Sequence, residues 1–161
     1  MRTTPSRGPA SPVTPASRSA TSRDIARIVA LIVGDALSFL VFSALGRGTH
    51  HETTGFAAFT DVVLTAAPFA LGWFLVAPFA GAYRRAKTAA LTDMLGRTGL
   101  AWLASWPVAL VLRWVFTSRF PPLSFALVAL VANTLFLAIW RGAFVVVAGL
   151  WQRGRLARSA S

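Results

Sequence analysis

The chain lacks cysteine and is poor in charge: charged residues make up 13% of its 161 residues, and only five are acidic. Without cysteine it has no disulfide, no thiol nucleophile and no thiolate metal ligand. A soluble domain carries about 25% charged residues, so this chain has too few to cover a surface in water. Hydrophobic residues reach 55% and the mean hydropathy is +0.61, a composition typical of a membrane protein.

Complete catalytic motifs are also missing. The patterns GxxxxGK[ST], GxGxxG and GxSxG, which cradle phosphates or present a nucleophilic serine, do not occur in the sequence. We therefore expect no cofactor and no enzymatic activity. The length allows one modest domain.

Positive charge is in excess. Sixteen Lys and Arg residues against five acidic ones give a formal net charge of +11 at pH 7. In a soluble protein such a balance would suggest nucleic-acid binding, but no fold that reads a nucleic-acid groove is indicated here. Most of the basic residues flank long apolar segments instead. We expect them to meet the anionic headgroups of a lipid bilayer, and we expect no nucleic-acid partner.

Four apolar segments lie close to the about 20 residues that a helix needs to cross about 30 Å of hydrocarbon. They are Ile25–Leu45, Val62–Tyr83, Leu95–Phe116 and Leu123–Trp151. Because lipid cannot satisfy backbone polar groups, these segments are expected to be helices. The predicted fold class is all-α, a four-helix transmembrane bundle in up-and-down order. Three prolines inside the segments are expected to kink them: Pro68, Pro78 and Pro107.

The two tails differ from the apolar region in composition and charge. Residues 1–23, rich in Pro, Ser and Arg, are predicted to be a disordered tail. Residues 24–151 form the predicted four-span membrane domain, and residues 152–161 form a basic tail. Twelve Lys and Arg residues flank the spans on the side of the termini against three on the other side, with Arg141 set aside. Both termini are therefore predicted to be cytoplasmic, in a multi-pass protein of the cell membrane.

A carboxylate lies inside the first apolar segment. Asp35 follows Ile25 by ten residues, so a helix would carry it about 15 Å deep, close to the bilayer centre. An unpaired carboxylate there costs about 2.5 to 3.5 kcal/mol, so it is protonated, paired inside the bundle or facing a wet cavity. Asn133 has the same predicted depth in the fourth segment, and Arg141 follows two turns later on the same face. We predict an intramembrane polar network of Asp35, Asn133 and Arg141, which either fixes the packing or serves as a proton or ion site.

Small residues accompany this carboxylate. Ala30, Gly34 and Ser38 recur every four residues, so they share one face of the first helix. Small side chains let a second helix approach closely inside a membrane. We therefore predict close helix packing along this face.

The connection after the first span is the most polar stretch outside the tails. His50, His51 and Glu52 suggest a metal site, but neighbouring positions on an irregular loop rarely present both imidazoles to one ion, and the HExxH spacing is absent. A solvated loop is the ordinary explanation, and we predict no metal. Asp61 and Arg113 are expected near the same face, where they would pair with each other or with charges of the loop. The candidate outer-face polar cluster is therefore Arg47, His50, His51, Glu52, Asp61 and Arg113.

Several short motifs follow one another along the chain: Gly34-Asp35, Phe42, Gly46-Arg47, His50, Pro68, Gly72-Trp73, Gly81-Ala82-Tyr83, Trp106-Pro107, Arg113 and Trp140-Arg141. In this order they resemble the landmarks of a prokaryotic membrane family called domain of unknown function 3054. The resemblance covers about Ile25–Val147, essentially the whole hydrophobic region. It implies an integral membrane protein with four spans and no assigned activity.

Two functions remain open on the sequence alone. The first is a non-enzymatic bundle that acts through association within the membrane, with itself or with another membrane protein. The alternative is a small transporter or channel component that uses Asp35 with Asn133 and Arg141. The first requires the buried polar groups to pair off in a dry bundle, whereas the second requires a polar cavity that reaches them.

The charge asymmetry yields a direct test of topology. Single cysteines introduced at Ser17, Thr53 and Ser159 give unique labelling sites, because the natural chain has none. An impermeant thiol reagent added to intact cells is expected to label only the cysteine at position 53. Labelling from outside at either terminal position would reject the predicted orientation.

Overall fold

The computed structural model describes residues 15–47, 55–84, 88 and 90–159. Four helices make up nearly all of this part: α1 (Pro15–Arg47), α2 (Phe56–Val76), α3 (Leu91–Thr117) and α4 (Leu123–Ser159). Each of them is long and apolar enough to cross a membrane, and the described residues contain no strand. The predicted all-α fold with four helices able to span a membrane is therefore confirmed.

The first and last helices, α1 and α4, are longer than the apolar segments that predict them. Helix α1 begins at Pro15, inside the range 1–23 for which composition predicts a disordered tail; the prediction for residues 1–14 lies outside the described residues. Helix α4 continues to Ser159, through most of the range 152–161 assigned to the basic tail. A helix elongates readily once formed, because each added residue closes a further hydrogen bond.

The second helix ends earlier than predicted. The apolar segment runs to Tyr83, but α2 ends at Val76 and residues 77–83 form turns. Gly81 has a φ of 74°, its N–H donates to the carbonyl of Pro78 at 3.1 Å, and the N–H of Ala82 donates to the carbonyl of Ala77 at 3.0 Å. These two bonds around a left-handed glycine are a Schellman motif, which ends a helix. Pro78 thus lies outside a helix, contrary to the prediction, whereas Pro68 lies inside α2 and Pro107 inside α3.

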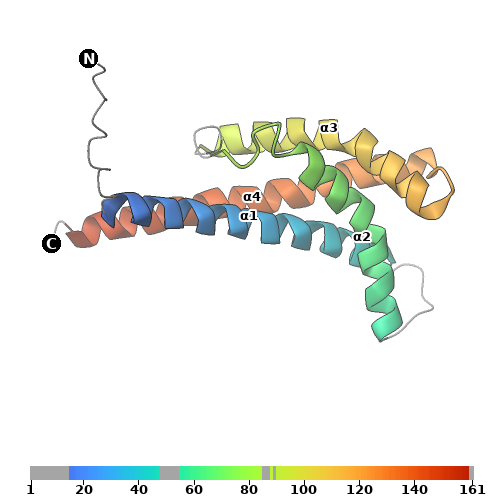
Figure 1. Ribbon diagram of the computed structural model, residues 1–161, viewed down its shortest axis with the longest axis horizontal. Coiled ribbons are helices and arrows are strands. Elements are labelled where there is room, and N and C mark those ends of the chain that lie inside the picture. Colours follow the sequence, from blue (N-terminus) through green and yellow to red (C-terminus); the bar gives the residue numbers. More distant parts are fainter. Residues whose placement is uncertain (1–14, 48–54, 85–87, 89, 160–161) are drawn as a thin grey trace, which may run out of the picture.

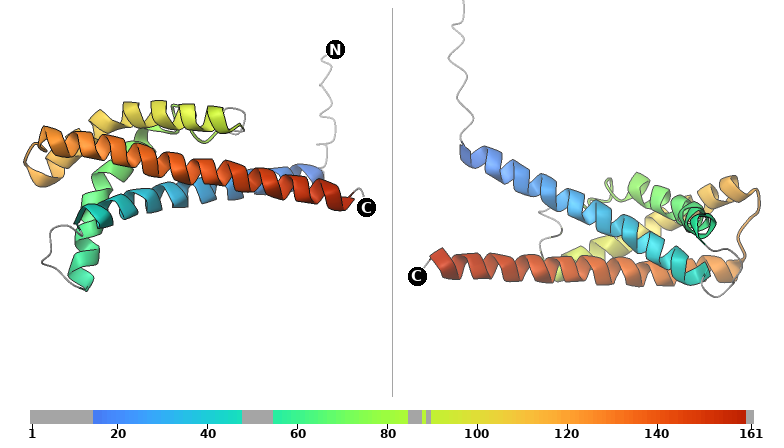
Figure 2. Two further views of the ribbon diagram at one scale, coloured as in Figure 1. Left: turned by 180° about the vertical axis from the view of Figure 1, so that it is seen from behind. Right: turned by 90° about the horizontal axis from the view of Figure 1, so that it is seen from below.

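The helices pack as a ring in chain order. Helix α2 packs against α1 and α3, and α4 packs against α3 and α1. Helix α1 begins and α4 ends at the same end of the molecule, while α2 bends and crosses the others steeply (Figure 1). Seen from below, α1 and α4 diverge toward that end (Figure 2). Their middle sections therefore form the contact between the first and last helices.

Aromatic side chains fill the centre of the ring. The rings of Phe39 on α1, Trp73 on α2 and Trp102 on α3 lie 5.4 to 6.4 Å apart between centroids, and all three are buried. The indole of Trp102 also donates a 3.0 Å hydrogen bond to the carbonyl of Leu130, and Trp106, one turn further along α3, binds the carbonyl of Ala126 in the same way. The two indoles thus fasten α3 to α4 while satisfying their own polar groups.

Two glycines allow close approach between helices. A Cβ on Gly34 of α1 would overlap the indole ring of Trp140 on α4. A Cβ on Gly72 of α2 would lie 2.9 Å from the backbone nitrogen of Ala109 on α3. The predicted close packing along the face of α1 is therefore present at Gly34.

The contact between Gly34 and Trp140 predicts a stability effect. Gly34→Ala is expected to destabilise the protein by about 1–3 kcal/mol, because the rigid indole must move to accept the methyl group. The matched control is Gly149→Ala on α4, where no atom lies within 4 Å of the added Cβ. That change is expected to leave stability unchanged or raise it by up to about 1 kcal/mol through helix propensity. Equilibrium unfolding in detergent micelles measures both, and equal effects would contradict the packing argument.

Candidate functional site: a buried ion pair at a helix break

Asp35 and Arg141 form an ion pair inside the bundle. Asp35 lies in the middle of the span Ser22–Gly46 on α1, and Arg141 lies on α4. The arginine Nη2 donates to Oδ2 of Asp35 at 2.6 Å and its Nε donates to Oδ1 at 2.9 Å. Both side chains are fully buried, with 0% exposure. The pair is therefore bidentate, the geometry in which a guanidinium binds a carboxylate most strongly.

Two further donors complete the surroundings of the carboxylate. The hydroxyl of Tyr83 donates to Oδ2 of Asp35 at 2.7 Å, and the indole N–H of Trp73 donates to the same oxygen at 3.0 Å. Together with the two bonds from Arg141, the carboxylate accepts four hydrogen bonds, so both of its oxygens have partners inside the bundle.

The guanidinium of Arg141 has partners beyond the carboxylate. Its Nη1 donates to the backbone carbonyl of Ala82 at 2.9 Å and lies 3.5 Å from the hydroxyl oxygen of Thr98. Its Cζ also lies 4.9 Å from the ring centroids of both Trp73 and Tyr83. The charge is thus held by a carboxylate, a carbonyl and two aromatic faces, a combination that offsets the loss of hydration.

The carbonyl of Ala82 belongs to the segment that follows the end of α2. Because α2 has stopped, the carbonyls of Ala82 and Tyr83 have no helical N–H partner, and an unsatisfied carbonyl is costly inside a membrane. Arg141 binds the first of these carbonyls, and Arg27 of α1 binds the second at 3.3 Å. Arg27 also donates to the hydroxyl of Thr88 at 2.6 Å. Two arginines therefore hold the non-helical segment against α1 and α4.

Asn133 does not join this network. Its Nδ2 donates to the carbonyl of Ala129 in its own helix at 2.9 Å, and within the described part of the chain its Oδ1 has no partner. Of the predicted network of Asp35, Asn133 and Arg141, only the ion pair between Asp35 and Arg141 is present. Asn133 precedes Arg141 by eight residues, about 12 Å along a helix. The structure brings Asp35 level with Arg141 instead of Asn133, and the close contact of Gly34 with Trp140 lies beside this pair.

The candidate outer-face polar cluster is only partly described. His50, His51 and Glu52 lie outside the described residues, and Arg47 is the last residue of α1. The remaining two members, Asp61 on α2 and Arg113 on α3, are both partly buried. Arg113 packs over the rings of Phe125 and Phe69 rather than pairing with Asp61. Among the described residues, no three His, Asp or Glu side chains gather at a place that suits a metal ion.

Sequence reasoning missed the aromatic donors to Asp35 and the backbone partners of the arginines. Trp73 and Tyr83 lie in one predicted span without a charged residue, and the sequence pattern names no partner for their polar groups. Gly81, placed between Pro78 and the only tyrosine of the chain, was the signal for a helix end. A tyrosine directly after a helix end inside an apolar segment needs a hydrogen-bond partner.

These features define the class of the protein: in its described residues it is all-helical, with four helices long and apolar enough to cross a bilayer and a buried ion pair beside the end of the second helix. The chain belongs to a family of proteins of unknown function, DUF3054, whose model matches residues 32–144. The resemblance seen in the motifs is thereby confirmed, and the matched range contains Asp35 and Arg141. No curated protein and no solved structure matches the chain.

The geometry of the ion pair predicts a strong double-mutant coupling. Asp35→Leu and Arg141→Met are each expected to destabilise the protein by about 3–5 kcal/mol, because each leaves one buried charge without its partner. The double variant removes both charges and is expected to be clearly more stable than the sum of the single changes implies. Equilibrium unfolding in bicelles gives the cycle. Additive effects would show that the two side chains do not depend on each other.

Asn133 provides the matched control for this cycle. Asn133→Leu removes a buried amide whose oxygen has no described partner, so it is expected to cost about 1 kcal/mol or less. A loss as large as that of Asp35→Leu would mean that Asn133, and not only Arg141, supports the carboxylate.

Proposed function

We propose that the protein is a non-enzymatic, multi-pass protein of the cell membrane that acts through lateral association, with a second copy or with another membrane protein. In this proposal the pair of Asp35 and Arg141 is an internal support of the fold. The bundle then presents its apolar outer faces to lipid and to its partner.

The observation that carries this proposal is the complete pairing of the buried charges. Asp35 accepts hydrogen bonds from three side chains, and Arg141 uses both of its Nη atoms and its Nε. Neither side chain is exposed to any degree. A carboxylate that carries an ion or a proton must exchange its partners during each cycle, and four donors oppose that exchange.

The basic end of the bundle supports contact with anionic lipid headgroups. Arg23 near the start of α1 and Arg153 near the end of α4 are exposed. The start of α1 and the end of α4 extend beyond α2 and α3 (Figure 1). Basic residues next to membrane spans attract anionic headgroups by about 1 kcal/mol each. The same charges favour the cytoplasmic orientation of both termini.

One observation favours the alternative of a transporter or channel component. The second passage is broken at residues 77–83, and Tyr83 from this segment reaches Asp35 at the middle of the first span. Non-helical segments beside buried charges occur at the binding sites of many transporters. In this alternative the segment would move and open a path to the ion pair, and Asn133 would line that path.

Reconstitution separates the two functions. Liposomes with the wild type are expected to show no proton or ion flux above protein-free liposomes, and Asp35→Asn is expected to change nothing. Energy transfer between two labelled populations is expected to persist as the lipid-to-protein ratio rises, because association is specific. Flux that Asp35→Asn abolishes would establish the transport function in place of the proposed one.

The matched control is Asp93→Asn, which removes an exposed carboxylate at the start of α3. Thermal unfolding in micelles accompanies each assay, so that a loss of flux is assigned to Asp35 only in a folded variant. Energy transfer that falls in proportion to lipid dilution would contradict lateral association.

A further inference from the structure

Arg113 is held by aromatic rings on two neighbouring helices. It lies on α3, one turn before the end of the helix at Thr117, and is partly buried. Its Cζ is 4.4 Å from the ring centroid of Phe125 on α4 and 6.0 Å from that of Phe69 on α2. At these distances the ring faces attract the cation, and this interaction uses none of its N–H groups as donors to an oxygen acceptor.

No described residue accepts a hydrogen bond from Arg113. A guanidinium carries five N–H donors, and those of Arg141 bind the carboxylate of Asp35 and the carbonyl of Ala82. Within the described part of the chain, the guanidinium of Arg113 interacts with the two aromatic rings. The aromatic contacts fix its position but leave the demand for acceptors unmet, and a partly buried charge without acceptors is costly.

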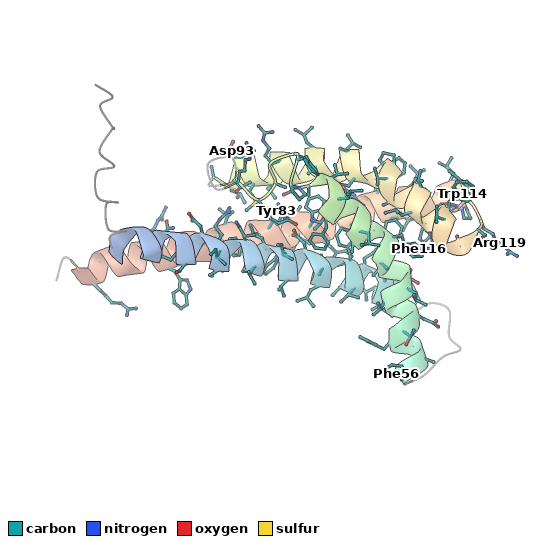
Figure 3. All side chains as sticks on the ribbon, in the orientation of Figure 1. Phe56, Tyr83, Asp93, Trp114, Phe116 and Arg119 are labelled. Atoms are coloured by element: carbon teal, nitrogen blue, oxygen red, sulfur yellow. The ribbon has the colours of Figure 1, made fainter. Side chains whose placement is uncertain are left out.

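Arg113 lies near the end of its span, at the depth where lipid headgroups are expected. The span Leu91–Thr117 ends four residues after Arg113, about 6 Å along the helix. Trp114, Phe116 and Phe120, all close to it in sequence, are about half or more exposed. Figure 3 shows Trp114, Phe116 and Arg119 gathered at this end of α3. Tryptophan prefers the boundary between hydrocarbon and headgroups, so the guanidinium lies within reach of phosphate oxygens.

We propose that Arg113, clamped over Phe125 and Phe69, binds the phosphodiester group of a membrane phospholipid. The planar fork of a guanidinium matches two phosphate oxygens, and its fixed positive charge favours an anionic group. The acyl chains of the same lipid lie along the exposed apolar side chains beside the site. This site stands apart from the proposed lateral association and does not depend on it.

Native mass spectrometry of the purified protein in micelles tests the site. The wild type is expected to retain added dioleoyl phosphatidylglycerol, and Arg113→Gln is expected to lower its retention about tenfold, the value of one charge-assisted hydrogen bond. Dioleoylglycerol, which has the same chains but no phosphate, is expected not to be retained. Arg119→Gln is the control, because Arg119 is exposed at the same end of the bundle and has no ring contact among the described residues; its retention is expected to equal that of the wild type.

Arg113→Lys keeps the charge without the fork. The lysine cation keeps the aromatic contacts, so the Arg113→Lys variant is expected to fold even if Arg113→Gln does not. It is expected to have the melting temperature of the wild type and to retain less phosphatidylglycerol. Equal retention by the wild type and both Arg113 variants would overturn the proposal. So would equal retention of dioleoylglycerol, an equal loss in Arg119→Gln, or displacement of the lipid by millimolar inorganic phosphate, which would make the ligand a soluble anion.

Discussion

The ion pair between Asp35 and Arg141 is the constraint on which the rest of the structure depends. A charge in the middle of a membrane span is tolerated only inside the bundle, where a partner of opposite charge can reach it. The two residues lie on the first and last helices, so their contact closes the ring of four. It also sets the position of α4 along α1, and Gly34 and Trp140, the residues directly before the charged ones, form the close contact beside it.

The end of α2 is linked to the same ion pair. A helix that stops inside a membrane exposes carbonyls that lipid cannot satisfy. Here Arg141 and Arg27 supply the missing donors, and Tyr83, brought in by the break, supplies a donor to Asp35. The break and the ion pair therefore stabilise each other: the pair provides donors for the open backbone, and the break provides an acceptor for the second Nη of the arginine.

Arg141 and Arg113 differ in what surrounds them. Arg141 has a carboxylate, a carbonyl and two aromatic faces, and its side chain is fully enclosed. Arg113 has aromatic faces alone and lies near the end of a span. A charge at the centre needs every donor bound within the protein, whereas a charge near the boundary can share its donors with headgroups. The surroundings within the protein thus distinguish Arg141, whose donors are bound inside the bundle, from Arg113, whose N–H groups have no acceptor among the described residues.

The sequence by itself determined the number of helices and their approximate ranges, because these follow from the length of the apolar segments. From the cost of a charge in lipid it also followed that Asp35 must be protonated, paired or in contact with water, and the sequence left these three open. It also predicted the close packing at Gly34. Only the tertiary structure decided that the partner is Arg141 and not Asn133. Counting residues from a helix end measures depth only if the helix begins at the membrane boundary, and α4 is longer than the bilayer is thick. The tertiary structure also decided the roles of Trp73 and Tyr83, since their donors meet Asp35 only after α2 has ended and the chain has turned back toward α1.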